Sequence, residues 1–442
     1  VTTASAARAL GMSKTRFHEG GALLESEAEL DEMDVLHFEE IGASVATMSE
    51  EKAAELREKS NVAEVIEDFE VFALADDNPG ISIDPSDGGN YPQGYWDDQP
   101  VIQALDSSQA DCPPGSRRFC IKLSPWSPPI CFCIPWRSGP PDPGPTPPPP
   151  PPNQAIPWNI TMVGADRVWS RVTGSGVKVA ILDTGIDDDH PDLSVSGGVS
   201  MVPAVTSWDD DHGHGTHCAG IVGARNNATG VVGVAPGSAL YAVKVLDGNG
   251  SGRLSWILAG MGWAVDNDMA VASMSLGSNV TSPDADCTLA YQRAAERLEA
   301  AGCLVVAAAG NNGRDTTNPW VGNPARCAGF MAVAAVDRNR KLADFSSRGP
   351  ASLCSNCGVE ISAPGVSISS TVPGGGLGTK SGTSMACPHV SGAAALLKEL
   401  HPSWTPSRIR ARLRATAQDL GVPGDDPGFG SGLLDCYQAV FG

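Results

Sequence analysis

The chain has 442 residues, of which 41% are hydrophobic and 18% are charged, a composition typical of soluble globular proteins. This length leaves room for two to four domains and at least one large core. The net charge of −21, with no basic face, argues against a nucleic-acid partner. No apolar run approaches the roughly 20 residues of a membrane-spanning helix, so we expect no transmembrane segment.

The acidity is concentrated near the N-terminus. Residues 1–77 carry 19 acidic and 6 basic groups, residues 78–152 carry 7 and 4, and residues 153–442 carry 25 and 20. This asymmetry indicates an N-terminal piece that is separable from the rest. The piece has the pattern of a small α+β unit, with strands predicted at 35–38 and 62–66 and a helix between them that opens on a capping box.

The middle of the chain, residues 78–152, is rich in Pro, Gly and Asp and has no periodicity. Its end, residues 139–152, is almost pure proline and predicts an extended polyproline II spacer. Four cysteines in this part allow three disulfide pairings, among which the sequence does not choose: Cys112, Cys120, Cys131 and Cys133.

Twelve cysteines in all indicate an oxidising compartment, so we expect a secreted protein whose signal peptide is not part of this sequence. Cys354-x-x-Cys357 could be half of a zinc site, but no second pair follows. We expect Cys218 and Cys387 to be small buried residues. The disulfide candidates of the C-terminal part are Cys287, Cys303, Cys327, Cys354, Cys357 and Cys436.

From Asn153 onward, strand and helix signals alternate, which predicts a largely parallel sheet covered by helices. Strands are predicted at residues 177–182, 239–246, 303–309 and 330–336. Helices are predicted at residues 217–224, 254–266, 290–301, 389–400 and 406–417.

Three polar residues of this region stand out. Asp183 ends a buried strand, the edge of an open α/β sheet at which ligand sites gather. His214 lies between two glycines, and Ser384 precedes an Ala-rich apolar helix, whose N-terminus favours negative charge. Each residue alone could be an ordinary cap or turn residue. His214 and His217 could also bind a metal, although no glutamate supports that alternative.

Together, Asp183, His214 and Ser384 are the residue types of an acyl-transfer site. A serine hydroxyl is a poor nucleophile unless an imidazole takes its proton, and a carboxylate on the other ring nitrogen fixes the tautomer.

Three segments then resemble the subtilisin-like serine proteases: residues 179–187, 214–217 and 382–389. The resemblance covers residues 153–442, and residues 1–74 are similar to the inhibitor-like prodomain of that family. It implies a three-layer α/β/α catalytic domain with a mostly parallel sheet, after a small α+β, ferredoxin-like prodomain. Residues 75–152 would be an insert and linker.

The resemblance also implies roles for further residues. The side chain of Asn311 would donate to the oxyanion beside the N–H group of Ser384, and Pro324 would follow a cis peptide bond. Two edges would pair with an extended substrate: Ser275, Leu276 and Gly277, and Gly250, Ser251 and Gly252. A pocket for a large apolar side chain would be lined by Ala308, Ala309, Gly310 and Gly322.

A structural Ca²⁺ site is also implied, because oxygen-only ligation suits this ion. Side-chain oxygens would come from Gln154, Asp192 and Asn227, and backbone carbonyls from Arg225, Thr229 and Val231.

The expected function is that of a secreted serine endopeptidase that acts on proteins or peptides and is made as a monomeric zymogen. Residues 71–74 would lie in the active site like a product, with Leu74 in the primary pocket, so that the prodomain inhibits its own enzyme until cleavage after Leu74. Two alternatives remain open at this stage: a catalytically silent binding protein, and a peptide ligase on the same scaffold.

Overall fold

The fold is known from a computed structural model of the whole chain. The residues that it describes are 35–38, 43–46, 53–54, 66, 68–74, 116–121, 130–135, 154, 156–227, 229–278, 287–349 and 358–442. Residues 78–146 form a compact unit of their own, and residues 1–77 and 147–442 form the other.

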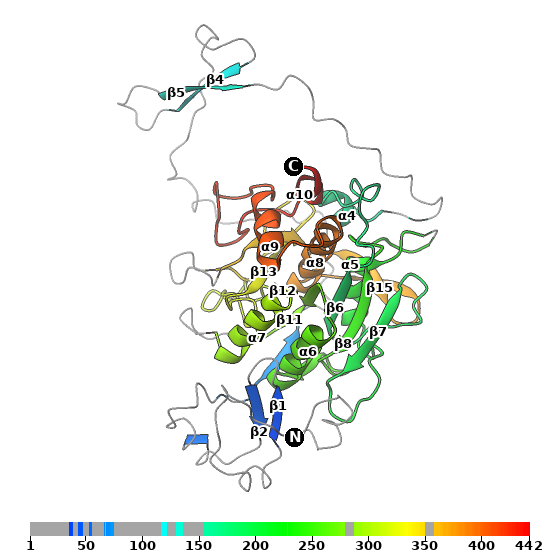
Figure 1. Ribbon diagram of the computed structural model, residues 1–442. Coiled ribbons are helices and arrows are strands. Elements are labelled where there is room, and N and C mark those ends of the chain that lie inside the picture. Colours follow the sequence, from blue (N-terminus) through cyan, green and yellow to red (C-terminus); the bar gives the residue numbers. More distant parts are fainter. Residues whose placement is uncertain are drawn as a thin grey trace. The chain divides into compact units, whose positions relative to one another are not determined.

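The larger unit is organised around a seven-stranded sheet in which every neighbouring pair is parallel (Figure 1). From one edge to the other the strands are β14 (Ile361–Pro364), β13 (Phe330–Val336), β12 (Leu304–Ala308), β10 (Val271–Met274), β6 (Lys178–Asp183), β8 (Ala239–Lys244) and β7 (Val195–Ser200). From β6 the chain goes to the edge strand β7, returns to β8 beside β6, and then adds β10, β12, β13 and β14 on the other side, so the strand order reverses beside β6. Open α/β sheets bind ligands at such a reversal.

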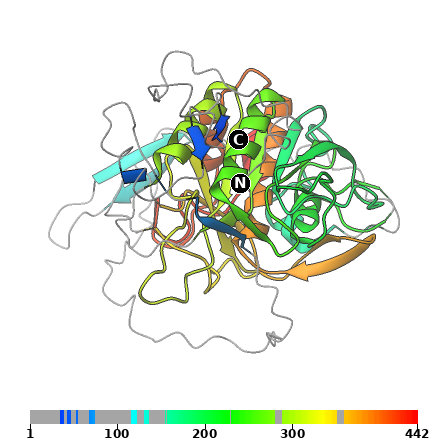
Figure 2. The same cartoon turned by 90° about the horizontal axis from the view of Figure 1, so that it is seen from below.

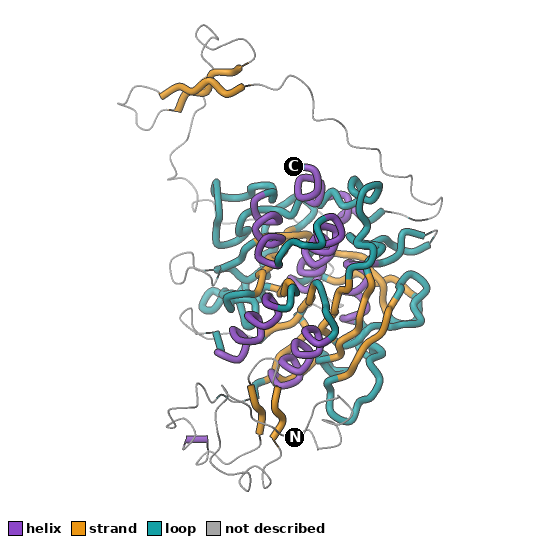
Figure 3. Tube along the Cα trace, in the orientation of Figure 1, coloured by secondary structure: helices purple, strands orange, loops and turns teal. Residues whose placement is uncertain are grey.

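The strands are nearly continuous apolar runs because both faces of the sheet are covered. Along β12, Leu304 and Val306 belong to one core cluster, whereas Val305 and Ala307 belong to the other. The first cluster lies against α5 (His214–Gly223), α8 (Thr383–Leu400), α9 (Pro406–Ala415) and α10 (Cys436–Phe441), and the second against α6 (Leu254–Asp266) and α7 (Leu289–Ala300) (Figure 3). The structure therefore has the three-layer α/β/α architecture that the sequence predicts.

The predicted elements of this unit agree closely with the observed ones. Residues 254–266 and 330–336 match α6 and β13 to the residue. The two helices nearest the predicted site begin earlier than their apolar patterns indicate: α5 begins at His214 and α8 at Thr383. Periodicity marks where a helix is buried, and the polar first turns of α5 and α8 fall outside that signal.

Smaller elements complete the description. They are α4 (Trp158–Met162), the hairpin of β15 (Ile368–Val372) and β16 (Gly376–Lys380), and a three-stranded sheet of β11 (Leu276–Gly277), β3 (Glu70–Ala73) and β9 (Ser251–Arg253) (Figure 2). In the described part of the chain, no helix is long and apolar enough to cross a membrane.

Two antiparallel hairpins form sheets separate from the seven-stranded one. One joins β1 (Val35–Phe38) to β2 (Ala43–Ala46), and the other joins β4 (Ser116–Ile121) to β5 (Ile130–Pro135). The strand at 35–38 confirms its prediction, whereas the strand at 43–46 is an element that the sequence did not predict. The predicted strand at 62–66 and the polyproline segment lie outside the described residues, apart from Ile66, which is not in a strand.

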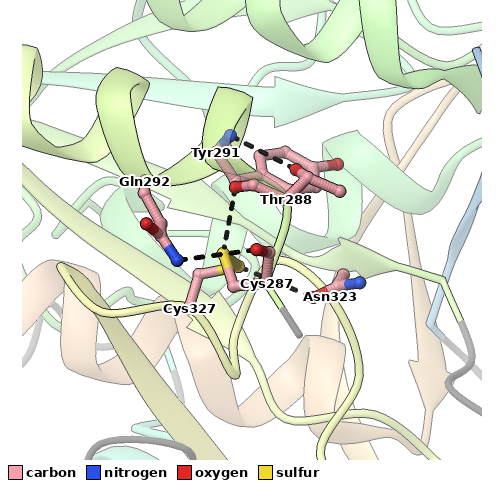
Figure 4. The surroundings of a disulfide bond; sticks show 6 residues. All are labelled: Cys287, Thr288, Tyr291, Gln292, Asn323 and Cys327. Atoms are coloured by element: carbon pink, nitrogen blue, oxygen red, sulfur yellow. Dashed lines mark hydrogen bonds between the residues drawn. A yellow bond between two sulfur atoms is a disulfide. The ribbon is translucent and has the colours of Figure 1, made fainter. Parts of the chain in front are cut away.

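A disulfide bond joins Cys287, just before α7, to Cys327, just before β13, across a sequence separation of 40 residues (Figure 4). Both cysteines were predicted candidates. Cys303 and Cys436 were candidates too, and that expectation is wrong: both are buried free thiols, as are Cys218 and Cys387. Cys303 directly precedes β12 and Cys436 begins α10, where they pack in the core as small apolar side chains. Cys354 and Cys357 lie outside the described residues.

We expect the Cys287–Cys327 bond to stabilise the fold mainly by constraining the unfolded chain. Cys287→Ala/Cys327→Ala should lower the free energy of unfolding by about 2–4 kcal/mol in a denaturant titration. Each single substitution also breaks the bond, so each should cost nearly as much as the pair. If the double variant lost as much unfolding free energy as the two single variants added together, a bond between these residues would be contradicted.

Candidate active site

Asp183 is the last residue of β6, at the carboxyl end of the strand beside which the strand order reverses. Its side chain is fully buried. Its Oδ1 accepts a hydrogen bond from the N–H group of Thr184 at 2.8 Å and lies 2.7 Å from Nδ1 of His214. The sheet and the start of α5 thus bring together two residues that are 31 positions apart.

His214 is the first residue of α5 and is also fully buried. The residue before it, Gly213, has a φ of 96°, a left-handed conformation that glycine adopts without the steric cost of a Cβ. Burial alone would lower the pKa of His214, but the Asp183 carboxylate and, to a smaller extent, Cys218 together outweigh this effect and hold that pKa well above its usual value. The Nδ1–H tautomer that Asp183 favours leaves Nε2 free to accept a proton.

Ser384 is the second residue of α8 and is likewise buried. Its Oγ donates to the backbone carbonyl of Ser275 at 2.9 Å, and Nε2 of His214 has no hydrogen-bond partner among the described residues. The hydroxyl and the imidazole are therefore not hydrogen-bonded to each other here. Cys218 contacts both residues, since its Sγ lies 4.0 Å from Nδ1 of His214 and 3.5 Å from the Ser384 carbonyl.

The alternative of a metal bound by His214 and His217 gains no support from their contacts. Nε2 of His217 lies 3.0 Å from the carbonyl of Ile368 and 3.1 Å from that of Gly378, whereas His214 bonds to Asp183. Burial lowers the pKa of His217 to about 3, so its ring is neutral. The two rings have separate partners.

The carbonyl oxygen of Leu74 receives two hydrogen bonds beside Ser384. The side-chain Nδ2 of Asn311 donates at 2.9 Å, and the backbone N–H of Ser384 donates at 3.4 Å. The Asn311 amide is oriented by Thr383, whose N–H and Oγ1 both donate to Oδ1 of Asn311, at 3.0 and 2.9 Å. This orienting role of Thr383 was not predicted, because a threonine before a serine at a turn is common and indicates no particular function.

The segment that leads to Leu74 lies as a strand between the two edges that the sequence predicted. Leu276 and Gly277 pair with Ala73 and Phe72 on one side, and residues 251–253 pair with residues 70–72 on the other. The N–H of Leu74 donates to the carbonyl of Ser275 at 3.3 Å, and the N–H of Ala73 donates to that of Gly250 at 2.9 Å. Val71 is fully buried, whereas Phe72 is 45% exposed.

The residues predicted to line a pocket lie close together. Gly322 donates its N–H to the carbonyl of Ala309 at 3.0 Å, and a side chain on Gly310 would come 3.7 Å from the same N–H group. A Cβ on Gly277 would lie 3.1 Å from Cδ1 of Leu74. Leu74 is half-buried against the core cluster that contains Ala308. The peptide bond before Pro324 is cis, as predicted.

The six residues predicted to bind Ca²⁺ also come together. The carbonyl oxygens of Arg225, Thr229 and Val231 converge on Nε2 of Gln154, at 2.7, 2.9 and 2.6 Å. Asp192 joins them, because its Oδ1 accepts from the Asn227 side chain at 2.9 Å and its Oδ2 from the N–H of Val231 at 2.8 Å. Three carbonyl oxygens exceed the two hydrogens of an amide, so this donor set suits a cation better than an NH₂ group.

Residues 174–432 match the model of the subtilase family. The chain belongs to the subtilase family. It is 46% identical over 289 residues to subtilisin from Bacillus pumilus, which covers 65% of this chain and 99% of that protein. It is 48% identical over 288 residues to subtilisin Savinase from Lederbergia lenta, with the same coverage, and 47% identical to a thermostable alkaline protease from Halalkalibacterium halodurans, over 65% of this chain and 74% of that protein. The chain is thus a subtilisin-type serine endopeptidase.

The raised pKa of His214 in this subtilase can be measured directly. An NMR titration of the full chain carrying Ser384→Ala should give His214 a pKa above the ordinary value of about 6.5. Asp183→Asn should lower it, because burial is the largest single effect and its main opponent is then removed. His217 serves as an internal control that stays neutral in both proteins from about pH 5 upward. A His214 pKa unaffected by Asp183→Asn would contradict the assignment.

Proposed function

We propose that this subtilase is a secreted endopeptidase, made as a zymogen that cleaves its own chain after Leu74. The observation that carries the proposal is the Leu74 carbonyl oxygen, which accepts hydrogen bonds from Asn311 and from the N–H of Ser384. A scissile carbonyl must occupy this position, because the oxygen that becomes negatively charged in the transition state then already faces its donors.

The proposed reaction begins with a rotation of the Ser384 side chain from the carbonyl of Ser275 toward Nε2 of His214. Staggered rotamers of a serine lie close in energy, and catalytic hydrogen bonds often tighten only with substrate in place. His214 takes the hydroxyl proton while Oγ attacks the carbonyl carbon. The ring then gives this proton to the leaving amine, and water hydrolyses the acyl-enzyme by the same route. Asp183 holds the tautomer and stabilises the imidazolium.

The prosegment inhibits the enzyme in this proposal because residues 70–74 bind as a product does. Main-chain hydrogen bonds to both edges give affinity, and side-chain pockets give preference. Val71 is fully buried, which contributes about 1.5–3 kcal/mol. Leu74 occupies the position before the cleaved bond, so we propose a preference for large apolar residues there, in the pocket of Ala308, Ala309, Gly310 and Gly322.

A Ca²⁺ ion would be held by oxygens of Gln154, Asp192, Asn227, Arg225, Thr229 and Val231. When bound, the ion would supply positive charge that ties together chain segments far apart in sequence. Gln154 is the first of these six residues in the sequence and lies 71 residues before Arg225. The role is structural, because none of these six residues contacts Asp183, His214 or Ser384.

Secretion and a monomeric state complete the proposal. The Cys287–Cys327 bond supports an oxidising compartment. Two alternative functions are compatible with the same fold. A catalytically inactive binding protein would lack a reactive serine, and a peptide ligase would pass the acyl group to an amine instead of water.

One experiment separates these functions. We expect a serine-directed phosphonate to label Ser384 of the processed chain, peptides to be hydrolysed after large apolar residues, and the new N-terminus to be Ala75. Ser384→Ala should remain uncleaved, and Asn311→Ala should lower kcat by about 10²–10³-fold, a magnitude established for the equivalent loss in subtilisin itself. Absence of labelling would favour a binding protein, and joined peptides would favour a ligase. An active preparation that contains only uncleaved chain would refute self-processing.

The cation site has its own test. In the Ser384→Ala background, Ca²⁺ at a hundred times its Kd should raise the free energy of unfolding by about 2.7 kcal/mol, and a chelator should reverse the gain. Asp192→Asn should abolish this response. Asp344→Asn, which removes an exposed carboxylate paired with Arg314, is the matched control and should leave it intact. Equal responses from the two variants would contradict the site.

A further inference from the structure

The strand that ends at Leu74 has a second anchor further back, at the start of α6. This helix begins at Leu254, and its own N-cap residue, Arg253, makes no side-chain capping bond. The cap comes from Asp68 instead. Oδ1 of Asp68 accepts from the N–H of Ser255 at 2.8 Å, and Oδ2 accepts from the Ser255 hydroxyl at 2.7 Å. Both carboxylate oxygens are therefore bound where the helix dipole is positive.

The surroundings of Asp68 also fit an extended acidic peptide. Nη1 of Arg253 donates to the Asp68 carbonyl at 3.1 Å, and the N–H of Leu254 donates to the carbonyl of Phe69 at 3.1 Å. The Phe69 ring packs edge-on against Tyr291 of α7, with 6.4 Å between ring centroids. Main-chain and side-chain contacts thus continue beyond the strand pairing of residues 70–72.

Tyr291 lies beside this anchor and keeps a buried polar group that Asp68 does not engage. The residue is fully buried, and its hydroxyl has no hydrogen-bond partner among the described residues. Burial raises the pKa of Tyr291, and the nearby negative charge of Asp68 raises it further, so the hydroxyl stays protonated and remains a donor. A buried donor without a partner is costly and is usually retained for a reason.

All the groups that hold Asp68 and Phe69 belong to the catalytic domain, at Arg253, Leu254, Ser255 and Tyr291. They stay with the enzyme after the prosegment is released, and the first turn of α6 then loses its cap. We propose that they form an exosite that binds an acidic side chain six residues before the scissile residue of extended polypeptide substrates, with an aromatic residue directly after it. This inference rests on the proposed function, which makes Leu74 the residue before the cleaved bond.

The spacing makes the proposal specific. The strand at residues 70–73 and the hydrogen bond from the N–H of Leu254 to the Phe69 carbonyl together hold the chain in a fixed register between Leu74 and Asp68. An acidic residue one position earlier or later would point away from Ser255, because side chains alternate along an extended chain. A general attraction of acidic peptides to a positive surface would not show this dependence on position.

The test uses the full chain after self-processing and three reporter peptides. The first is Asp-Phe-Glu-Val-Phe-Ala-Leu with a fluorogenic amide, the second replaces Asp by Asn, and the third places Asp one residue earlier with Gly in its former position. We expect kcat/KM for the first peptide to exceed the other two by about tenfold, since hydrogen bonds to a charged group are the stronger kind. The advantage should shrink with added salt.

Ser255→Ala should reduce the preference for Asp over Asn to about threefold, because one of the two bonds remains. Ser196→Ala, at an exposed serine on β7, is the matched control and should keep the full ratio. Equal kcat/KM for the Asp and Asn peptides in the parent enzyme would overturn the exosite.

The short peptide Val-Phe-Ala-Leu with the same reporter separates this failure from that of the proposed function. Cleavage of the short peptide without an Asp preference in the long one removes the exosite and leaves the endopeptidase. Failure to cleave any of the peptides would overturn both.

Discussion

The hydrogen bond between Asp183 and His214 is the contact on which the rest of the site depends. Both side chains are fully buried, and a buried carboxylate or imidazolium is costly unless it is paired. The parallel sheet meets that requirement, because it delivers Asp183 to an edge where the strand order reverses and α5 can begin directly opposite. The pair gives His214 a defined tautomer, and so a free Nε2 directed to the reaction.

The backbone carbonyl of Ser275 connects this pair to the substrate position. It accepts both the Ser384 hydroxyl and the N–H of Leu74, so one oxygen locates the predicted nucleophile and the residue that it would attack. Asn311, held by Thr383, donates to the carbonyl oxygen of Leu74 itself, on the other side of that residue's peptide unit. These groups come from the ends of β10 and β12 and from the start of α8, and the rigid sheet and helix keep them in register. The proposed reaction then needs only a rotation of the Ser384 side chain toward His214.

Much of this arrangement was predictable from sequence, and what was missed has physical causes. Buried strands such as 330–336 are unbroken apolar runs, and the glycines around His214 and Ser384 mark sharp turns. The prediction of disulfides at Cys303 and Cys436 was wrong because a sequence does not distinguish a free cysteine from a disulfide-bonded one. Only the packing shows that both are core residues. Thr383 and Tyr291 act through contacts with residues far along the chain, which no local pattern reports. The Asp68–Ser255 contact spans 187 residues, and neither residue is unusual in its own segment.

The start of α6 shows how a local inconsistency can indicate function. The residue directly before the helix supplies a side-chain cap to α7, α9 and α10, whereas α4, α5, α6 and α8 have no such cap. α6 instead takes its cap from a segment that the proposed processing would remove. The N-terminus of α6 is capped only while the prosegment is bound, so this contact favours binding and its loss costs free energy. Such a contact suits the proposed inhibitor, which would fold with the enzyme and later leave it. The same incompleteness persists in the processed enzyme, and an extended substrate with a carboxylate in register would satisfy it again.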